Sequence, residues 1–403
     1  MTGPVLQVGP DGTALSADGQ VLPVGGPYPV AGGPDVLVGE LWVLAGQSNM
    51  EGLGLLSGTE APHPLIRVYG SDETWSRAQE PLHDLPASPR AVHARLMAEA
   101  GHVPPAPGKR LQGAGLGLAF ARRRTKETGL PIGLISCAHG GTSMSQWSAE
   151  GPDDLQDSLY GAMLDRVRAC GSKVAGVLWY QGESDVGAED WPRYDERMTA
   201  WLAALRADLA RPELPLLMVQ LGRVIGADDP NVVLGWNEIR ERQRHWAASQ
   251  PGVEIVAAID LELDDFIHID TAGLRTLGFR LAQAQQGHAG LQPAGAVMAS
   301  SPLGTPSLHL TVAGVAGQLR SSGPPTGFSL RDAQGDVLPL IYKVELRGDA
   351  VLLHLTGPLP VSDARLWYGW GLNPVCNVVD QAGQALLAFT LSLDQPQAPP
   401  AFY

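Results

Sequence analysis

The chain has 403 residues, 44% of them hydrophobic and 17% charged, so it is long enough for a large buried core and is not disordered. Its formal net charge of −14 disfavours contact with phosphate backbones, which argues against a nucleic acid partner. The sequence shows no leader pattern and no apolar run long enough to cross a membrane, so we expect a cytoplasmic protein, although a secreted protein without its leader would look the same.

Residues 1–38 are rich in Gly and Pro and predict short strands that lead into the main domain. From residue 39 to about 290, continuous apolar runs alternate with helical patterns. Continuous runs are typical of strands buried on both faces, so this region predicts a three-layer α/β/α domain with a parallel sheet. The runs are Leu41–Ala45, Ile132–Cys137, Val174–Tyr180, Leu214–Leu221 and Val253–Ile259, and the helical patterns are Leu116–Lys126, Trp191–Leu209, Val232–Ser249 and Thr271–Gln285.

Two regions depart from this alternation. Residues 54–113 are rich in Pro, His and charge, and we expect an insertion that covers the strand ends and shapes the pocket. Residues 300–403 contain short alternating runs separated by turns, which predict an antiparallel β domain that docks on the first domain. We expect residues 287–306 to form the linker between the two.

The first polar block, Gly46-Gln47-Ser48-Asn49, follows the apolar run that ends at Ala45. Ligands of open α/β sheets bind where such strands end, so Ser48 is a candidate nucleophile that would need a base to take its proton. The block is not a Gly-x-Ser-x-Gly elbow, because Met50 stands at the second glycine. A helix N-cap is the alternative role for Ser48.

The second block runs from Cys137 to Ser143 and contains Gly140 and Gly141. Two glycines after a strand allow a tight turn whose backbone N–H groups form an oxyanion hole, although an ordinary strand-to-helix turn has the same pattern. We expect His139 to line the pocket, since no orienting carboxylate lies near it in sequence. Cys137 lies in an apolar run and is expected to be a buried small hydrophobic residue.

The third block, Trp179 to Asp185, ends an apolar strand in a dense polar cluster. The Gln181 amide can donate to an oxyanion without adding charge. Glu183 and Asp185 suit a structural role in holding loop N–H groups. A glycosidase pair is the other possibility for these two carboxylates, but it leaves Ser48 without a function.

The fourth block contains Asp265 and His268, three residues apart in a turn before a predicted helix. This spacing lets the Asp265 carboxylate reach Nδ1 of His268 and leaves Nε2 to face a serine. A solvated surface turn is the alternative. Three other carboxylates compete for the orienting role and fit the spacing less well: Asp260, Asp264 and Asp270.

No motif indicates a bound cofactor. The glycines around Gly115 do not follow a clear strand, and no phosphate loop accompanies them. The three cysteines are far apart and form no Cys-x-x-Cys pair, so they predict neither a disulfide framework nor a zinc site.

Taken in order, the four blocks resemble the SGNH-hydrolase superfamily, and within it the sialate O-acetylesterase-like carbohydrate esterases. The resemblance covers most of the chain, but residues 54–113 match only in patches. The residues that carry it are Val38-Gly39-Glu40-Leu41-Trp42, Gly46-Gln47-Ser48-Asn49-Met50-Glu51, Gly140-Gly141-Thr142 with Trp147, Trp179-Tyr180-Gln181-Gly182-Glu183-Ser184-Asp185, Asp265-x-x-His268 and, in the β domain, Leu366-Trp367-Tyr368-Gly369-Trp370 with Asn373-Pro374.

This resemblance implies a flavodoxin-like sheet and a Ser–His–Asp mechanism. Ser48 would be the nucleophile, His268 the base and Asp265 the residue that orients His268. The implied oxyanion hole consists of the Ser48 N–H, an N–H of Gly140 or Gly141, and the Gln181 amide. Residues expected to contact the substrate are Gln47, Asn49, His139 and Glu183.

Two positions differ from the family pattern. Ile269 stands where a proline usually follows the histidine, so the turn between Asp265 and His268 is expected to differ. His139 stands where a small or aromatic residue is more usual, which affects the expected substrate preference.

We therefore predict a serine carbohydrate O-acetylesterase that forms an acetyl-enzyme, requires no cofactor and acts on acetylated carbohydrate rather than on nucleic acid or membrane. One alternative is a short-chain aryl or lipid esterase with the same three residues. Another is a non-catalytic glycan-binding protein, but Ser48, Asp265 and His268 are all present. The sequence leaves open the sugar, the hydroxyl and the oligomeric state.

Overall fold

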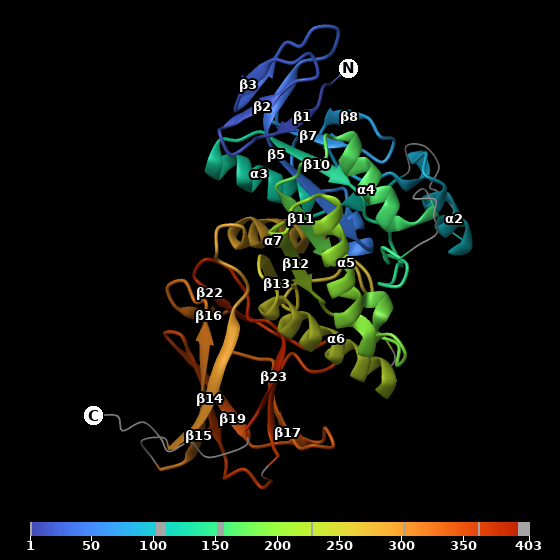
Figure 1. The fold of residues 1–403 in the computed structure, drawn as a ribbon. Helices are drawn as coiled ribbons and strands as arrows, with labels where there is room; N and C mark the ends of the chain where they lie inside the picture. Colours follow the sequence, from blue (N-terminus) through green and yellow to red (C-terminus); the bar gives the residue numbers. More distant parts are fainter. Residues whose placement is uncertain are drawn as a thin grey trace.

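The computed structural model describes residues 2–101, 110–150, 157–226, 229–300, 304–361 and 363–393. A sheet flanked by helices forms the upper part of the molecule in Figure 1, and smaller β-sheets form the lower part. Parts of the ranges expected as an insertion and as a C-terminal domain, residues 102–109 and 394–403, lie outside the described residues. Among the described helices, none combines the length and apolarity needed to cross a bilayer.

A parallel sheet forms the centre of the first domain. The order along the sheet is β13-β12-β11-β5-β10-β7-β8, and within this order the strands are parallel except for β8, which pairs antiparallel with β7. Without β7 and β8, the order is the flavodoxin-like one, which confirms the predicted fold class. The strands are β5 (Val36–Gly46), β7 (Ile66–Tyr69), β8 (Trp75–Arg77), β10 (Ile132–Ser136), β11 (Gly176–Tyr180), β12 (Leu216–Gln220) and β13 (Val253–Ala257).

Helices cover both faces of this sheet (Figure 1). The helices α3 (Gly117–Thr128) and α7 (Thr271–Ala284) pack against each other on one face. On the other face, α5 (Tyr194–Asp208) packs against α6 (Pro230–Ser249), and α4 (Leu159–Ala169) lies beside them. Central strand residues such as Leu41, Leu134 and Leu178 are fully buried, as the continuous apolar runs predict.

The N-terminal segment extends the central sheet. Strand β1 (Val5–Gln7) pairs parallel with β5, and β4 (Gly25–Tyr28) pairs antiparallel with it. Between them, β2 (Thr13–Leu15) and β3 (Val21–Pro23) form a hairpin. The expected lead-in of short strands is therefore part of the same sheet.

Residues 54–113, expected as an insertion that covers the strand ends and shapes the pocket, also contribute to the central sheet. Strands β7 and β8 from this range extend the central sheet beyond β10. The remainder adds β6 (Gly54–Leu55) paired with β9 (Gln112–Ala114), the 3₁₀ helix η1 (Leu85–Ala87) and the helix α2 (Ala91–Glu99).

The C-terminal region consists of antiparallel sheets. Part of the expected linker, residues 287–306, is strand, because β14 (Gln292–Ser300) pairs along its length with β15 (Pro306–Ala313). The other strands are β16 (Leu319–Ser321), β17 (Phe328–Arg331), β18 (Val337–Leu338), β19 (Ile341–Arg347), β20 (Ala350–Leu355), β21 (Arg365–Tyr368), β22 (Val378–Asp380) and β23 (Phe389–Ser392).

Buried hydrogen bonds join this region to the first domain. The Gln220 side chain at the end of β12 donates to the Ala388 carbonyl and accepts from the Ala388 N–H. Arg240 in α6 is fully buried and donates to the carbonyls of Gly369 and Gly371. Because unpaired buried polar groups are costly, these contacts hold the two parts together.

Candidate active site

Three of the four polar blocks meet at the carboxyl edge of the sheet. Gly46 pairs with Tyr180 at the ends of β5 and β11, and the Gln47 N–H donates to the Tyr180 carbonyl at 2.8 Å. The His139 N–H, just after β10, donates to the Gly46 carbonyl at 3.0 Å. In this strand order the carboxyl edge beside the first strand is the usual ligand position.

Only glycine fits at position 46. Its φ of +130° is unfavourable for other residues, and a Cβ there would lie 2.1 Å from the Tyr180 carbonyl oxygen. The tight turn places Ser48 at the first position of the short helix α1 (Ser48–Glu51). Because Gln47 is the N-cap residue and no side chain caps this helix, the alternative role of Ser48 as a cap does not hold.

Asp265 and His268 form a hydrogen-bonded pair, with 2.6 Å between Asp265 Oδ2 and His268 Nδ1. Asp265 Oδ1 also accepts the N–H groups of Ile267 and His268, each at 2.8 Å. Burial opposes ionisation of Asp265, but these hydrogen bonds outweigh it and hold its pKa below the usual value. With Nδ1 facing a carboxylate, Nε2 is the nitrogen left to accept a proton.

The residue after the serine holds this histidine loop. Asn49 Oδ1 accepts the Ile269 N–H at 3.0 Å, and Asn49 Nδ2 lies 3.4 Å from the Ile267 carbonyl. Asn49 therefore binds the residues on both sides of His268. Since Asn49 adjoins Ser48 in α1, these contacts bring the serine and the histidine loop together.

Three of the residues expected to contact substrate are structural instead. Asn49 is 2% exposed and Gln47 is 3% exposed. Asn49 Nδ2 donates to Glu183 Oε1 at 2.9 Å, and the Gln47 amide can donate to Glu183 Oε2 at 3.1 Å. Glu183, in the 3₁₀ helix η3 (Glu183–Asp185), is thus a buried acceptor for the residues on both sides of Ser48.

The oxyanion-hole prediction needs correction at two donors. The Gln181 side chain is fully buried, and its amide donates to Asp185 Oδ2 at 2.5 Å and to the Thr142 carbonyl at 3.0 Å, so both hydrogens are in use. The Gly140 N–H donates to Glu51 Oε2 at 2.8 Å. Neither group is free to bind a developing oxyanion in this arrangement.

Two backbone donors remain near the serine. A Cβ at Gly140 would lie 3.4 Å from Ser48 Cβ, so the glycine turn lies directly beside Ser48. Gly141 follows with a φ of +68° and is exposed. Within the described ranges, the N–H groups of Ser48 and Gly141 have no hydrogen-bond acceptor, and they are the available candidates.

His139 does not face an open pocket. It is 4% exposed and stacks on His93 of α2, with 2.8 Å between the two Nδ1 atoms. Burial, reinforced by the charge of His139, lowers the pKa of His93 to about 3. This contact packs α2 against the residue that precedes the glycine turn, so His139 has a structural role at this turn.

Glu51, for which the sequence pattern predicts no role, lies at the glycine turn that contains Gly140. Its carboxylate holds the Gly140 N–H, and burial raises its pKa to about 7. Glu51 lies three residues after Ser48, one helical turn away on the same side of α1. That spacing is the signal in the sequence that points to this residue.

Within the part of the chain that the structure describes, no three His, Cys, Asp or Glu side chains are grouped so as to hold a metal ion. The candidate site contains Ser48, the Asp265–His268 pair and the N–H groups around them. The fold is of the SGNH type, and Ser48 and the Asp265–His268 pair lie at the carboxyl edge of its sheet.

Comparisons with known proteins agree with this class. Residues 38–286, more than half of the chain, match the family model described as carbohydrate esterase, sialic acid-specific acetylesterase. The chain therefore belongs to this family of carbohydrate esterases.

Individual relatives and solved structures similar to this chain are also named as carbohydrate or sialate esterases. A probable carbohydrate esterase of Arabidopsis thaliana is 32% identical over 268 residues, which cover 61% of this chain and 89% of the relative. A sialate O-acetylesterase of Pongo abelii is 28% identical over 176 residues, 37% of this chain and 32% of that protein. The crystal structure of a carbohydrate acetylesterase from Xanthomonas citri covers 93% of this chain and 88% of its own, with a TM-score of 0.67 and 24% identity, and so supports the fold.

Glu183→Gln should make stability less dependent on pH. Burial raises the pKa of Glu183 from 4.5 to about 7 in the folded protein. As pH rises from about 4.5 to 7, Glu183 therefore loses its proton in the unfolded chain before it does so in the folded protein, and the wild type loses stability over this range. Relative to wild type, the variant should gain about 3 kcal/mol in unfolding free energy across this range. Urea unfolding at several pH values measures this gain, and Glu189→Gln in an exposed position nearby is the control. A constant difference between wild type and Glu183→Gln would contradict the expectation.

Two replacements of Glu51 distinguish the effect of its hydrogen bond on kcat/KM from the effect of its charge. Glu51→Gln keeps an acceptor for the Gly140 N–H and should retain most of the wild-type kcat/KM on a small acetyl ester. Glu51→Ala leaves that N–H unpaired and should lower kcat/KM by about tenfold through a less ordered turn. Steady-state kinetics measure both, and equal rates for Glu51→Ala and wild type would show that the contact is dispensable.

Proposed function

We propose that this protein is a serine O-acetylesterase that removes acetyl groups from sugar hydroxyls. The main support is the position of His268, which is hydrogen-bonded to Asp265. Asn49, the residue after Ser48, binds the residues before and after this histidine. Membership of the carbohydrate esterase family and the named activities of the relatives support the choice of an acetylated carbohydrate.

In the proposed mechanism, Ser48 Oγ attacks the acetyl carbonyl carbon while His268 Nε2 takes the serine proton. The resulting oxyanion accepts hydrogen bonds from the Ser48 and Gly141 N–H groups. Collapse of this intermediate breaks the ester bond, and the sugar oxygen leaves with the proton from His268. Water then attacks the acetyl-enzyme in the same way and releases acetate.

Each supporting residue has a defined task in this scheme. Asp265 keeps His268 in the tautomer that accepts at Nε2 and stabilises the imidazolium that forms. Glu51 and Gln181 act on the glycine turn rather than on the substrate, because Glu51 binds the Gly140 N–H and Gln181 binds the Thr142 carbonyl. The substrate would approach over Gly141 and His268, at the exposed side of the turn.

Ser48→Ala should abolish turnover. Without a nucleophile, kcat on a small acetyl ester and on acetylated sugars should fall by about 10³-fold or more, while the fold is unchanged. Release of acetate from acetylated sialic acids, xylo-oligosaccharides and hexosamines measures the loss and shows which sugar is preferred. Ser184→Ala, whose hydroxyl makes no hydrogen bond to the described residues, is the control. A Ser48→Ala rate equal to that of wild type would refute the serine mechanism.

An apolar rim beside His268 favours a second candidate, a short-chain aryl esterase with the same three residues. Phe266 is 60% exposed, and its ring centre lies 6.4 Å from that of His268. Ile225 is 53% exposed and its N–H donates to the Phe266 carbonyl. An exposed aromatic face suits either an aryl group or the apolar face of a sugar. Activity that stays constant from acetyl to octanoyl esters would favour this candidate.

Phe266→Ala should distinguish between these leaving groups. If a sugar packs on the ring, KM for the preferred acetylated sugar should rise about three- to tenfold, whereas kcat/KM for an acetyl ester of a small alcohol should change little. The control Leu15→Ala removes an equally exposed apolar side chain from β2. No change with any acetylated sugar would remove Phe266 from substrate binding.

A further inference from the structure

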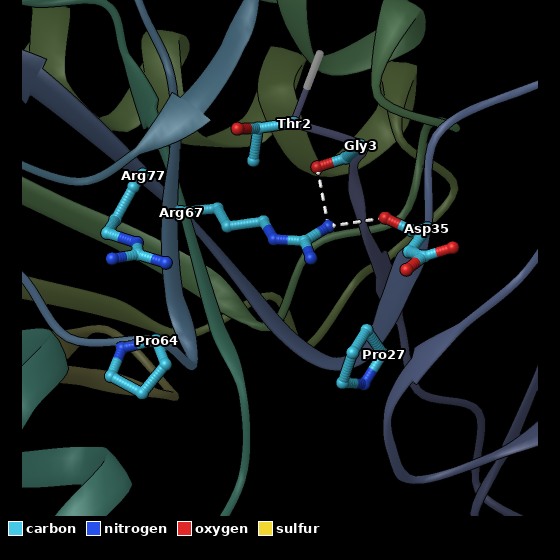
Figure 2. Close-up of a pocket in the computed structure, with 7 residues that line it drawn as sticks. All are labelled: Thr2, Gly3, Pro27, Asp35, Pro64, Arg67 and Arg77. Atoms are coloured by element: carbon cyan, nitrogen blue, oxygen red, sulfur yellow. Dashed lines mark hydrogen bonds between the residues drawn. The ribbon is translucent and has the colours of Figure 1, made fainter.

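A second pocket lies at the opposite edge of the sheet from Ser48. It has a volume of about 260 Å³ and opens between segments that precede β1, β5 and β7, together with the end of β8. Figure 2 shows the residues that line it: Thr2, Gly3, Pro27, Asp35, Pro64, Arg67 and Arg77. Because these segments come before parallel strands, the pocket is at the amino edge and is separate from the carboxyl-edge site.

Arg67 is a buried cation without a carboxylate partner. It is 8% exposed, and its Nη1 donates only to backbone carbonyls, those of Gly3 at 2.7 Å, Pro4 at 3.1 Å and Asp35 at 2.8 Å. In Figure 2 the dashed line to Asp35 ends on its backbone carbonyl and not on its carboxylate. The Asp35 carboxylate acts on Arg67 only through its charge, because no ion pair or hydrogen bond joins the two side chains.

Part of the Arg67 guanidinium remains available to a ligand. Its Nε and Nη2 have no acceptor among the described residues, and in Figure 2 the second terminal nitrogen points away from Gly3 and Asp35. Burial lowers the pKa of Arg67, the negative charge of Asp35 partly offsets this and the positive charge of Arg77 adds to it, but a guanidinium stays protonated in proteins.

Arg77 supplies a second cation to the same pocket. It is exposed and forms no ion pair or side-chain hydrogen bond with the described residues. The pocket thus contains two guanidinium groups and one carboxylate, in a chain whose overall charge is −14. Two guanidinium groups that share one pocket repel each other unless an anion lies between them.

We propose that this pocket binds a small phosphate-type oxyanion between Arg67 and Arg77. Guanidinium groups present several N–H donors in a plane and bind phosphate oxygens through charge-assisted hydrogen bonds. Two guanidinium groups and one carboxylate leave the pocket with a net positive charge. The oxygens of a phosphate can accept from both guanidinium groups, whereas acetate has only two oxygens. The ligand source is either free phosphate or the phosphate group of a small ester, and both share this chemistry.

Calorimetric titration of the full chain with inorganic phosphate tests the proposal. The wild type should bind one phosphate with a Kd of about 1 mM or tighter. Acetate should bind more than tenfold more weakly. Both titrations are run at the same ionic strength, so that salt screening does not differ between them. A hexose phosphate in a parallel titration distinguishes the two sources: tighter binding than phosphate indicates a phosphate ester, and weaker binding indicates the free ion.

Arg77→Ala is the diagnostic variant, because Arg77 is exposed and its removal leaves the folded core intact. It should weaken phosphate binding at least about tenfold and leave acetyl ester hydrolysis unchanged, so the test is independent of the proposed esterase mechanism. The control Arg365→Ala removes an exposed arginine of β21 and should bind phosphate like wild type. No phosphate binding by the wild type, or equal binding by Arg77→Ala, would overturn the proposal.

Discussion

The hydrogen bonds of the Asn49 side chain are the constraint on which the proposed site depends. They join the turn after β5 to a loop 220 positions further along the chain, through Ile269 on one side of His268 and Ile267 on the other. Glu183, buried beneath, accepts from the same side chain and fixes its orientation. A buried amide that lost these partners would leave several polar groups unsatisfied, which explains how one residue can hold two distant segments together.

The sequence predicts the fold where the local pattern is unmixed. The five buried runs of the central sheet are continuous and apolar, and the structure places each of them in a strand. Strand β7 escapes this reasoning because Arg67 interrupts a short apolar run, and only the structure shows its guanidinium bound to carbonyls of the N-terminal segment. Strand β14 escapes it because its residues are half-buried and do not alternate, so its pairing with β15 carries no local signal.

At the site, the sequence identifies residues whose partners are close in the chain and fails where the partner is distant. Asp265 and His268 are three residues apart, so their hydrogen bond follows from spacing. The donors predicted at Gly140 and Gln181 are instead bound by carboxylates, and the Gly140 partner, Glu51, comes from a different strand end. The stacking of His139 on His93 likewise depends on where α2 packs, which no local pattern specifies.

In the proposed site, Asn49 holds the His268 loop so that Ser48 becomes reactive. The most direct measurement is the rate at which a fluorophosphonate labels the protein, with the modified residue located by peptide mass spectrometry. We expect stoichiometric labelling at Ser48 in the wild type. In Asn49→Ala, which keeps the serine but releases the His268 loop, labelling should be slower by about 10²-fold or more. Labelling at another residue, or equal rates for Asn49→Ala and wild type, would contradict it.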